Sequence, residues 1–220
     1  MASSSLTART LIILFAMMSG ILNGDDAGGK KSSKKKSVKP KRFRKYGKLK
    51  PSDFRGQPPQ TKSILSKLDA YSMTVMRYEM DYKYTVRNSR WTIRLRALRI
   101  FATFDRMKSW NQKPFDDELL DHEQGHFDIT QVAALAAQRE IAEKLKKRRV
   151  SGQGRSKTQA MKRLRTKIDV LLQRNVAQLP NLHRDYDRVT RSGLDTKQQT
   201  AQRRNQKQQL KDLKAVRKKR

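Results

Sequence analysis

The chain has 220 residues, with 52 Lys or Arg against 20 Asp or Glu and a formal net charge of +32. This balance favours anionic partners, and the absence of Cys excludes disulfides and lipid attachment to a cysteine. The length left between the charged ends suits one modest domain and excludes two.

Residues 1–27 have the pattern of an export signal. Arg9 precedes an apolar run from Leu11 to Met18, which continues to Leu22 and gives way to small and polar residues. A run of this length suits the h-region of a signal peptide and is short for a membrane span. We therefore predict an exported protein, periplasmic or secreted, with an uncleaved anchor as the alternative.

Basic segments flank the centre of the chain. Twelve Lys or Arg and no acidic residue lie between Gly29 and Pro51, and the last eighteen residues hold nine basic residues against Asp212 alone. We predict that residues 28–60 form a disordered Lys/Pro-rich linker and residues 203–220 a disordered basic tail. Both attract anionic polymers or surfaces nonspecifically, or they are solvated with no partner. The centre carries no recognisable nucleic-acid recognition motif.

Residues 61–202 are predicted to form the folded domain. Apolar and polar residues alternate from Arg77 to Val86, which predicts a strand with one buried face. Residues 87–90 resemble a turn, and a second alternating run starts at Trp91 and has a break near Leu98. The pattern predicts two or three antiparallel strands.

The segment after these strands contains the motif His122-Glu123-Gln124-Gly125-His126. On a helix, residues four apart lie on one face, so the two His can offer imidazole nitrogens to one Zn²⁺. Glu123 would then be the general base for a zinc-bound water. Gly125 costs about 1 kcal/mol relative to Ala in a helix interior, which indicates a close approach to the backbone there. The alternative is two polar His on a helix surface.

The motif helix is predicted to begin near Asp116 and to continue to about residue 148, because neither Gly nor Pro occurs from 127 to 148. Glu140 and Glu143 then lie too far along the helix to share a metal with His126, since fourteen residues span about 21 Å. A third ligand must come from elsewhere in the chain.

A turn is predicted at 151–154, followed by a second amphipathic helix that stops at Pro180. If the two helices are antiparallel, their similar lengths return the chain to the metal near residue 180. His183, Asp185 and Asp187 are the candidate third ligands there, and we select Asp187. Alternatively, these residues cap a helix and pair with nearby Arg.

The run from His122 to Ile129 closely resembles the His-Glu-Gln-x-His-Phe-Asp-Ile core of a family of secreted bacterial proteins described as predicted zinc-dependent proteases. The segments 104–110 and 186–190 are similar to the family's other conserved segments, and the resemblance covers residues 62–203. It implies His122 and His126 as ligands and Glu123 as the catalytic base. The family usually has His where this chain has Ser192. Either Asp187 or His183 would take the place of that His, or metal affinity and activity would be reduced.

Together these patterns predict a small α+β, zincin-like domain with antiparallel strands, a long motif helix and a second antiparallel helix. The expected function is an exported zinc metallopeptidase that acts on a protein or peptide substrate. The alternative is a catalytically inactive zincin-fold protein that binds anionic polymers or surfaces through its basic tails.

Overall fold

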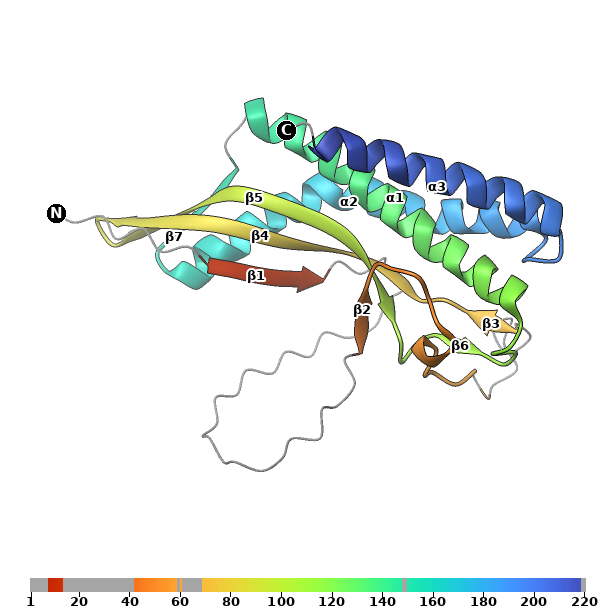
Figure 1. Ribbon diagram of the computed structural model, residues 1–220. Coiled ribbons are helices and arrows are strands. Elements are labelled where there is room, and N and C mark those ends of the chain that lie inside the picture. The colour runs from red at the N-terminus through yellow and green to blue at the C-terminus, as the bar shows by residue number, and fades with distance from the viewer. Residues whose placement is uncertain (1–7, 14–41, 59, 61–68, 148–149, 219–220) are drawn as a thin grey trace.

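The computed structural model describes residues 8–13, 42–58, 60, 69–147 and 150–218. In this part of the chain an antiparallel sheet is covered on one face by long helices (Figure 1). The predicted α+β class with antiparallel strands is confirmed. None of the helices in the described residues is both long and apolar enough to cross a membrane.

The main sheet has the strand order β1-β4-β5-β2, and β7 pairs with β5 near the opposite end of that strand from β2. Two short strands, β3 and β6, form a separate antiparallel pair. The strands are β1 (Ala8–Ile13), β2 (Phe43–Lys45), β3 (Ala70–Tyr71), β4 (Thr74–Arg87), β5 (Arg90–Asp105), β6 (Trp110–Asn111) and β7 (Ser151–Gly154).

β4 and β5 form one long hairpin. Asn88 and Ser89 at its tip have φ values of 46° and 57°, as a tight two-residue hairpin turn requires, so the predicted turn is confirmed. The register shifts after Asp81, which pairs with Ala97 while the next residue pairs with Leu95. A bulge therefore lies at Arg96, close to the predicted break.

Three helices follow: α1 (Asp117–Lys147), α2 (Lys157–Thr190) and α3 (Thr196–Lys218). α1 has nearly the predicted bounds. The prediction that the second helix stops at Pro180 is wrong, because α2 continues through it. Leu179 and Tyr186 on either side of the proline are buried, and this packing outweighs the cost of one interrupted backbone hydrogen bond. The predicted turn at 151–154 is also wrong, since these residues form β7.

The main core lies between the sheet and the first two helices. Its buried side chains come from β4, β5, α1 and α2, and they include Tyr78, Ile100, Ala137, Ile141, Leu164, Ile168 and Leu172. A smaller cluster at the other end of β5 joins Phe104 and Phe127. α1 and α2 thus pack on the sheet through apolar contacts. This packing fixes the rotation of α1 about its axis, and so the direction in which the two motif His project.

The predicted limits of the domain need two corrections. Part of the predicted linker is ordered. Asp53 lies in the 3-10 turn Pro51–Asp53 and Leu49 lies just before it, and each is only 2% exposed. The predicted disordered tail is mostly helix α3, whose Arg203 and Leu210 are buried. Of the predicted signal peptide only β1 is described; the rest, and residues 28–41, lie outside the described residues.

Candidate metal centre

Two motif His of α1 and one Asp of α2 meet in the space between these helices. The Nε2 atoms of His122 and His126 lie 3.2 and 2.9 Å from Oδ1 of Asp187. The antiparallel return of α2 brings Asp187 to this position from 61 residues beyond His126 in the chain. Of the predicted site residues, the structure brings these three together as a group that could hold a metal ion.

The spacing of these atoms fits one small metal ion. Tetrahedral ligands about 2.0–2.1 Å from a metal are separated from one another by roughly 3.3 Å. The two nitrogens are each close to that distance from the Asp187 oxygen, and all three ligand atoms lie within 4.8 Å of one another. Two imidazoles and one carboxylate also match the ligand types that zinc takes in catalytic sites.

The group is accessible from the side of Asp187. Its side chain is 42% exposed, whereas those of His122 and His126 are 4% and 12% exposed. Burial opposes ionisation of Asp187, but hydrogen bonds from the two His hold its pKa below the ordinary value for Asp. The carboxylate is therefore anionic, as a metal ligand must be.

The other two candidate ligands lie elsewhere. His183 is behind the cluster, where its Nδ1 lies 3.0 Å from Nδ1 of His126 and its Nε2 lies 3.2 Å from Oγ1 of Thr130. Burial, reinforced by the nearby His126, lowers the pKa of His183 to about 3, so its imidazole is neutral. Asp185 is exposed and pairs with Arg188. His183 is thus placed to orient His126 through its second ring nitrogen, as outer-shell groups do for metal-binding His.

Glu123 is buried beside the two His. The residue is 3% exposed, and its Oε2 has no hydrogen-bond partner among the described residues. Burial and the charge of Glu123 together raise the pKa of Tyr71, which places the carboxylate near β3. A buried carboxylate oxygen without a partner is costly, which is typical of a group kept for a ligand or for chemistry.

Tyr186 packs against both motif His. Its ring stacks on His122 with centroids 4.9 Å apart and meets His126 edge-on at 5.1 Å. A Cβ at position 125 would come within 2.5 Å of the ring carbon that bears the hydroxyl. Gly125 therefore accommodates the Tyr186 ring, which explains the glycine in the middle of α1.

The turn after α2 closes the site on another side. Gly193 has a φ of +89°, and a Cβ there would lie 3.2 Å from Cγ of His122. Ser192, where the resembled family has His, also has positive φ and donates its backbone N–H to the carbonyl of Asp187 at 2.7 Å. The position that lacks the expected imidazole is thus next to the cluster, in a turn that touches it.

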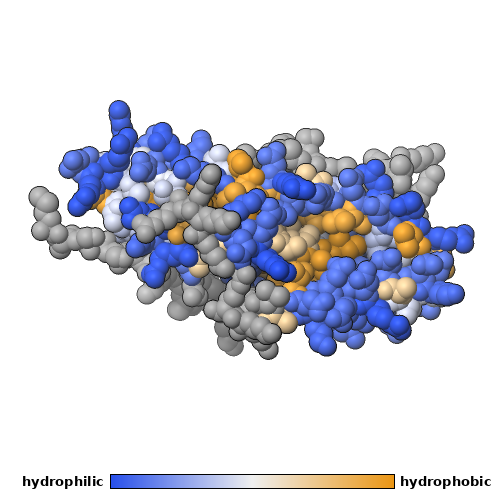
Figure 2. All heavy atoms as spheres, turned by 90° about the horizontal axis from the view of Figure 1, so that it is seen from above, coloured by the Kyte–Doolittle hydropathy of each residue, from blue (hydrophilic) through white to orange (hydrophobic). Residues whose placement is uncertain are grey.

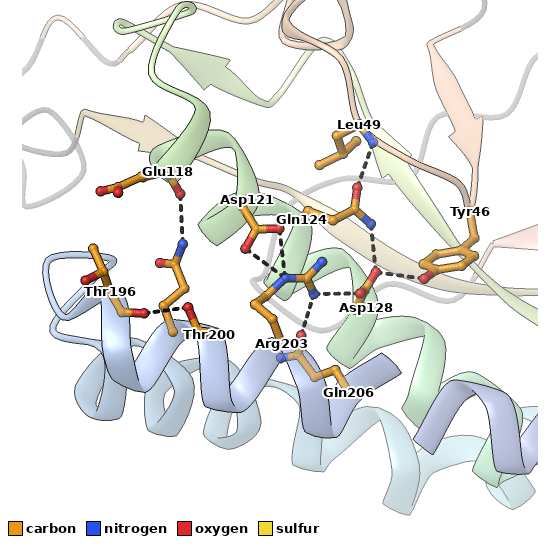
Figure 3. A network of polar contacts seen from close by, with 11 residues as sticks. Tyr46, Leu49, Glu118, Asp121, Gln124, Asp128, Thr196, Thr200, Arg203 and Gln206 are labelled. Carbon is orange, nitrogen blue, oxygen red and sulfur yellow. Dashed lines mark hydrogen bonds and ion pairs between the residues drawn. The ribbon is translucent and has the colours of Figure 1, made fainter. Parts of the chain in front are cut away.

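A polar network holds the opposite side of α1 (Figure 3). Arg203 of α3 donates to both carboxylate oxygens of Asp121 at 3.2 Å and to Asp128 at 2.6 Å. Asp128 also accepts from Tyr46 and Gln124, each at 2.7 Å. Charge composition placed Arg203 in a predicted tail and gave no sign of this role. The sequence signal for its burial is the 3–4 spacing of Gln199, Arg203, Gln206 and Leu210.

The fold and the site define an α+β protein with a His₂Asp cluster on a long helical hairpin. A family described as "Bacterial protein of unknown function (DUF922)" matches residues 67–193. This match spans more than half of the chain and includes all three cluster residues, so the protein belongs to that family. Neither the curated proteins nor the solved structures contain a match to the chain.

Proposed function

We propose that the protein is a zinc-dependent peptidase of zincin-like design, with His122, His126 and Asp187 as ligands. The observation that carries the proposal is the convergence of the two Nε2 atoms on one carboxylate oxygen, beside a buried Glu123 whose Oε2 has no partner in the described part of the chain. A site that only stabilised the helices would not need that second carboxylate.

Zinc held there would polarise a peptide carbonyl and lower the pKa of its bound water to about 7. Glu123 would take a proton from the water while the water oxygen forms a bond to the carbonyl carbon. The same carboxyl group returns the proton to the amide nitrogen as the C–N bond breaks, so one carboxylic acid and one amine are released. The substrate enters from the exposed side of Asp187, and Tyr186 keeps the imidazole of His122 in position.

Export accords with this function but rests on the sequence pattern of residues 1–27. The basic segments at both ends of the chain would keep the enzyme near an anionic surface.

A second candidate is a catalytically inactive protein of the same fold that binds anionic polymers or surfaces. The observation in its favour is Ser192, which leaves no imidazole at a turn position adjacent to the cluster. The formal charge of +32 also favours such partners.

The test is the metal content and activity of the purified protein. We expect about one zinc per chain, lost in the His122→Ala/His126→Ala variant. Glu123→Gln should retain zinc but lose cleavage of a labelled, denatured protein by at least about a hundredfold. Glu118→Gln, an exposed carboxylate on the same helix, is the matched control and should cleave normally. Undiminished cleavage by Glu123→Gln would refute the assignment, and zinc binding without cleavage by the wild type would favour the second candidate.

A further inference from the structure

Two internal stretches of the chain contain no acidic residue. Residues 82–104 hold six Lys or Arg, and residues 144–168 hold eleven. The first covers most of β5 and the β4–β5 turn, and the second covers the end of α1, β7 and the start of α2. The positive charge of this protein is therefore not confined to its two ends.

The fold brings these two stretches together. β7 pairs antiparallel with the first residues of β5, so that Trp91 lies opposite Gly154 and Arg94 opposite Ser151. β7 also packs closely on α2, because a Cβ at Gly154 would lie 2.7 Å from the backbone nitrogen of Ala160. This pairing joins the hairpin tip and the start of α2 at one end of the molecule.

A cavity of about 370 Å³ opens at this junction. It is lined by Arg90, Gly154, Arg155, Gln159 and Arg163, which come from the start of β5, from β7 and its following loop, and from α2. Three arginines from separate places in the chain thus line one space, and no acidic residue is among its lining residues.

The positive charge of the cavity has no counterpart in the described part of the protein. No ion pair between described residues neutralises Arg90, Arg155 or Arg163, and the one side-chain hydrogen bond of Arg163 goes to the backbone carbonyl of Gln153 at 2.9 Å. The three arginines are exposed, and an anion shared between them would offset their mutual repulsion and accept charge-assisted hydrogen bonds from them.

The start of α2 adds to the same potential. This helix of 34 residues has no acidic residue in its first turn, and its N-cap Ser156 accepts from the N–H of Gln159, one of the cavity residues. The positive end of the helix dipole therefore has no carboxylate in its own first turn, and it lies at the cavity that Gln159 lines.

We propose that this cavity binds the phosphate group of a phosphorylated ligand, with Arg90, Arg155 and Arg163 as its donors. The planar guanidinium suits phosphate because it can donate two parallel hydrogen bonds to two oxygens. The site is remote from the His₂Asp cluster, since α1 runs about 31 Å from His126 to its end at Lys147. Figure 1 shows β7 and the hairpin tip at the end of the molecule opposite β3 and β6.

Calorimetric titration of the full chain with inorganic pyrophosphate tests the proposal. Arg155→Gln/Arg163→Gln should weaken binding by about tenfold or more, because two charge-assisted donors are lost. Arg174→Gln/Arg184→Gln removes the same charge from exposed positions farther along α2 and should change binding by less than about twofold. Should circular dichroism find the first variant unfolded, Arg90→Gln replaces it and should weaken binding by about threefold or more.

Two outcomes would overturn the proposal: no measurable pyrophosphate binding by the wild type, or equal weakening in the cavity and control variants. Vesicles that contain phosphatidate separate the two sources of phosphate. Vesicle binding that is lost in the cavity variant would assign the site to a lipid headgroup. Vesicle binding unaffected by that variant, together with pyrophosphate binding that is lost in it, would assign the site to a soluble phosphate compound. Neither result depends on peptidase activity.

Discussion

Substitution of Gly125 by Ala separates helix propensity from packing at the candidate metal centre. In a helix interior free of contacts, this change stabilises by about 1 kcal/mol. Here the added methyl group would lie 2.5 Å from the ring carbon that bears the Tyr186 hydroxyl and 2.9 Å from a neighbouring ring carbon. Overpacking of this kind costs about 1–3 kcal/mol. The free energy of unfolding of Gly125→Ala should therefore lie between the wild-type value and about 2 kcal/mol below it.

A double-mutant cycle with Tyr186→Ala measures the contact itself. Once the ring is absent, Gly125→Ala should stabilise by the full propensity gain, so the coupling free energy should be about 1–3 kcal/mol. Urea unfolding of the four proteins without metal gives this value. Zinc affinity should also fall by about 10–100-fold in Gly125→Ala, since the displaced ring supports His122. Stabilisation by about 1 kcal/mol in both backgrounds, with coupling below about 0.5 kcal/mol, would refute the reasoning.

Two further substitutions test α3 and the third ligand. Arg203→Ala should lower the free energy of unfolding by about 3 kcal/mol, because Asp128 keeps a buried charge without its ion-pair partner. Arg204→Ala, at an exposed neighbour, should change it by less than about 0.5 kcal/mol, and equal urea midpoints for the two variants would contradict a structural role for α3. Asp187→Asn should weaken zinc binding by about a hundredfold or more in competition with a chromogenic chelator, whereas Asp185→Asn should leave it unchanged. A larger effect at Asp185 would show that the third ligand is misassigned.

The sequence was most informative where hydropathy has a clear period. The alternation from Arg77 to Val86 predicted β4, and the absence of Gly and Pro after Phe127 predicted the length of α1. Helix lengths alone predicted that the chain returns to the motif near residue 180, and the structure brings Asp187 there. Each of these inferences depends on local geometry, which the sequence determines almost without tertiary context.

The sequence was least informative where polar residues are buried. α3 contacts α1 through Gln199 and Arg203, and Gln206 beside Arg203 is also buried. Because these buried residues are polar, hydropathy does not distinguish α3 from a solvated basic tail. Pairing of Arg203 with Asp121 and Asp128 depends on residues about 80 positions apart, which no local pattern reports. The prediction that the second helix ends at Pro180 failed for a different reason. Tertiary packing of α2 outweighed the local tendency of proline to end a helix.

One hydrophobic area has no described element over it. Figure 2 shows apolar residues gathered over the helical part of the molecule and bordered by hydrophilic ones. A groove of about 380 Å³ lies between the three helices, with Ile129, Val132 and Leu182 among its apolar lining residues and Gln178 and Gln202 among its polar ones. Although the chain is strongly basic, no Lys or Arg lines this groove.

The separation of the ligands along the chain gives the cluster a mechanical consequence. His122 and Asp187 are 65 residues apart, and the segment between them includes most of α1, β7 and most of α2. In the chain-entropy treatment, a covalent link across a loop of that length contributes about 4 kcal/mol. In a protein without Cys, an ion bound here would cross-link distant segments and tie the start of the helical hairpin to its end. Removal of the ion would then destabilise both ends of the hairpin together. The free energy of unfolding would therefore increase with the fraction of chains that hold the ion.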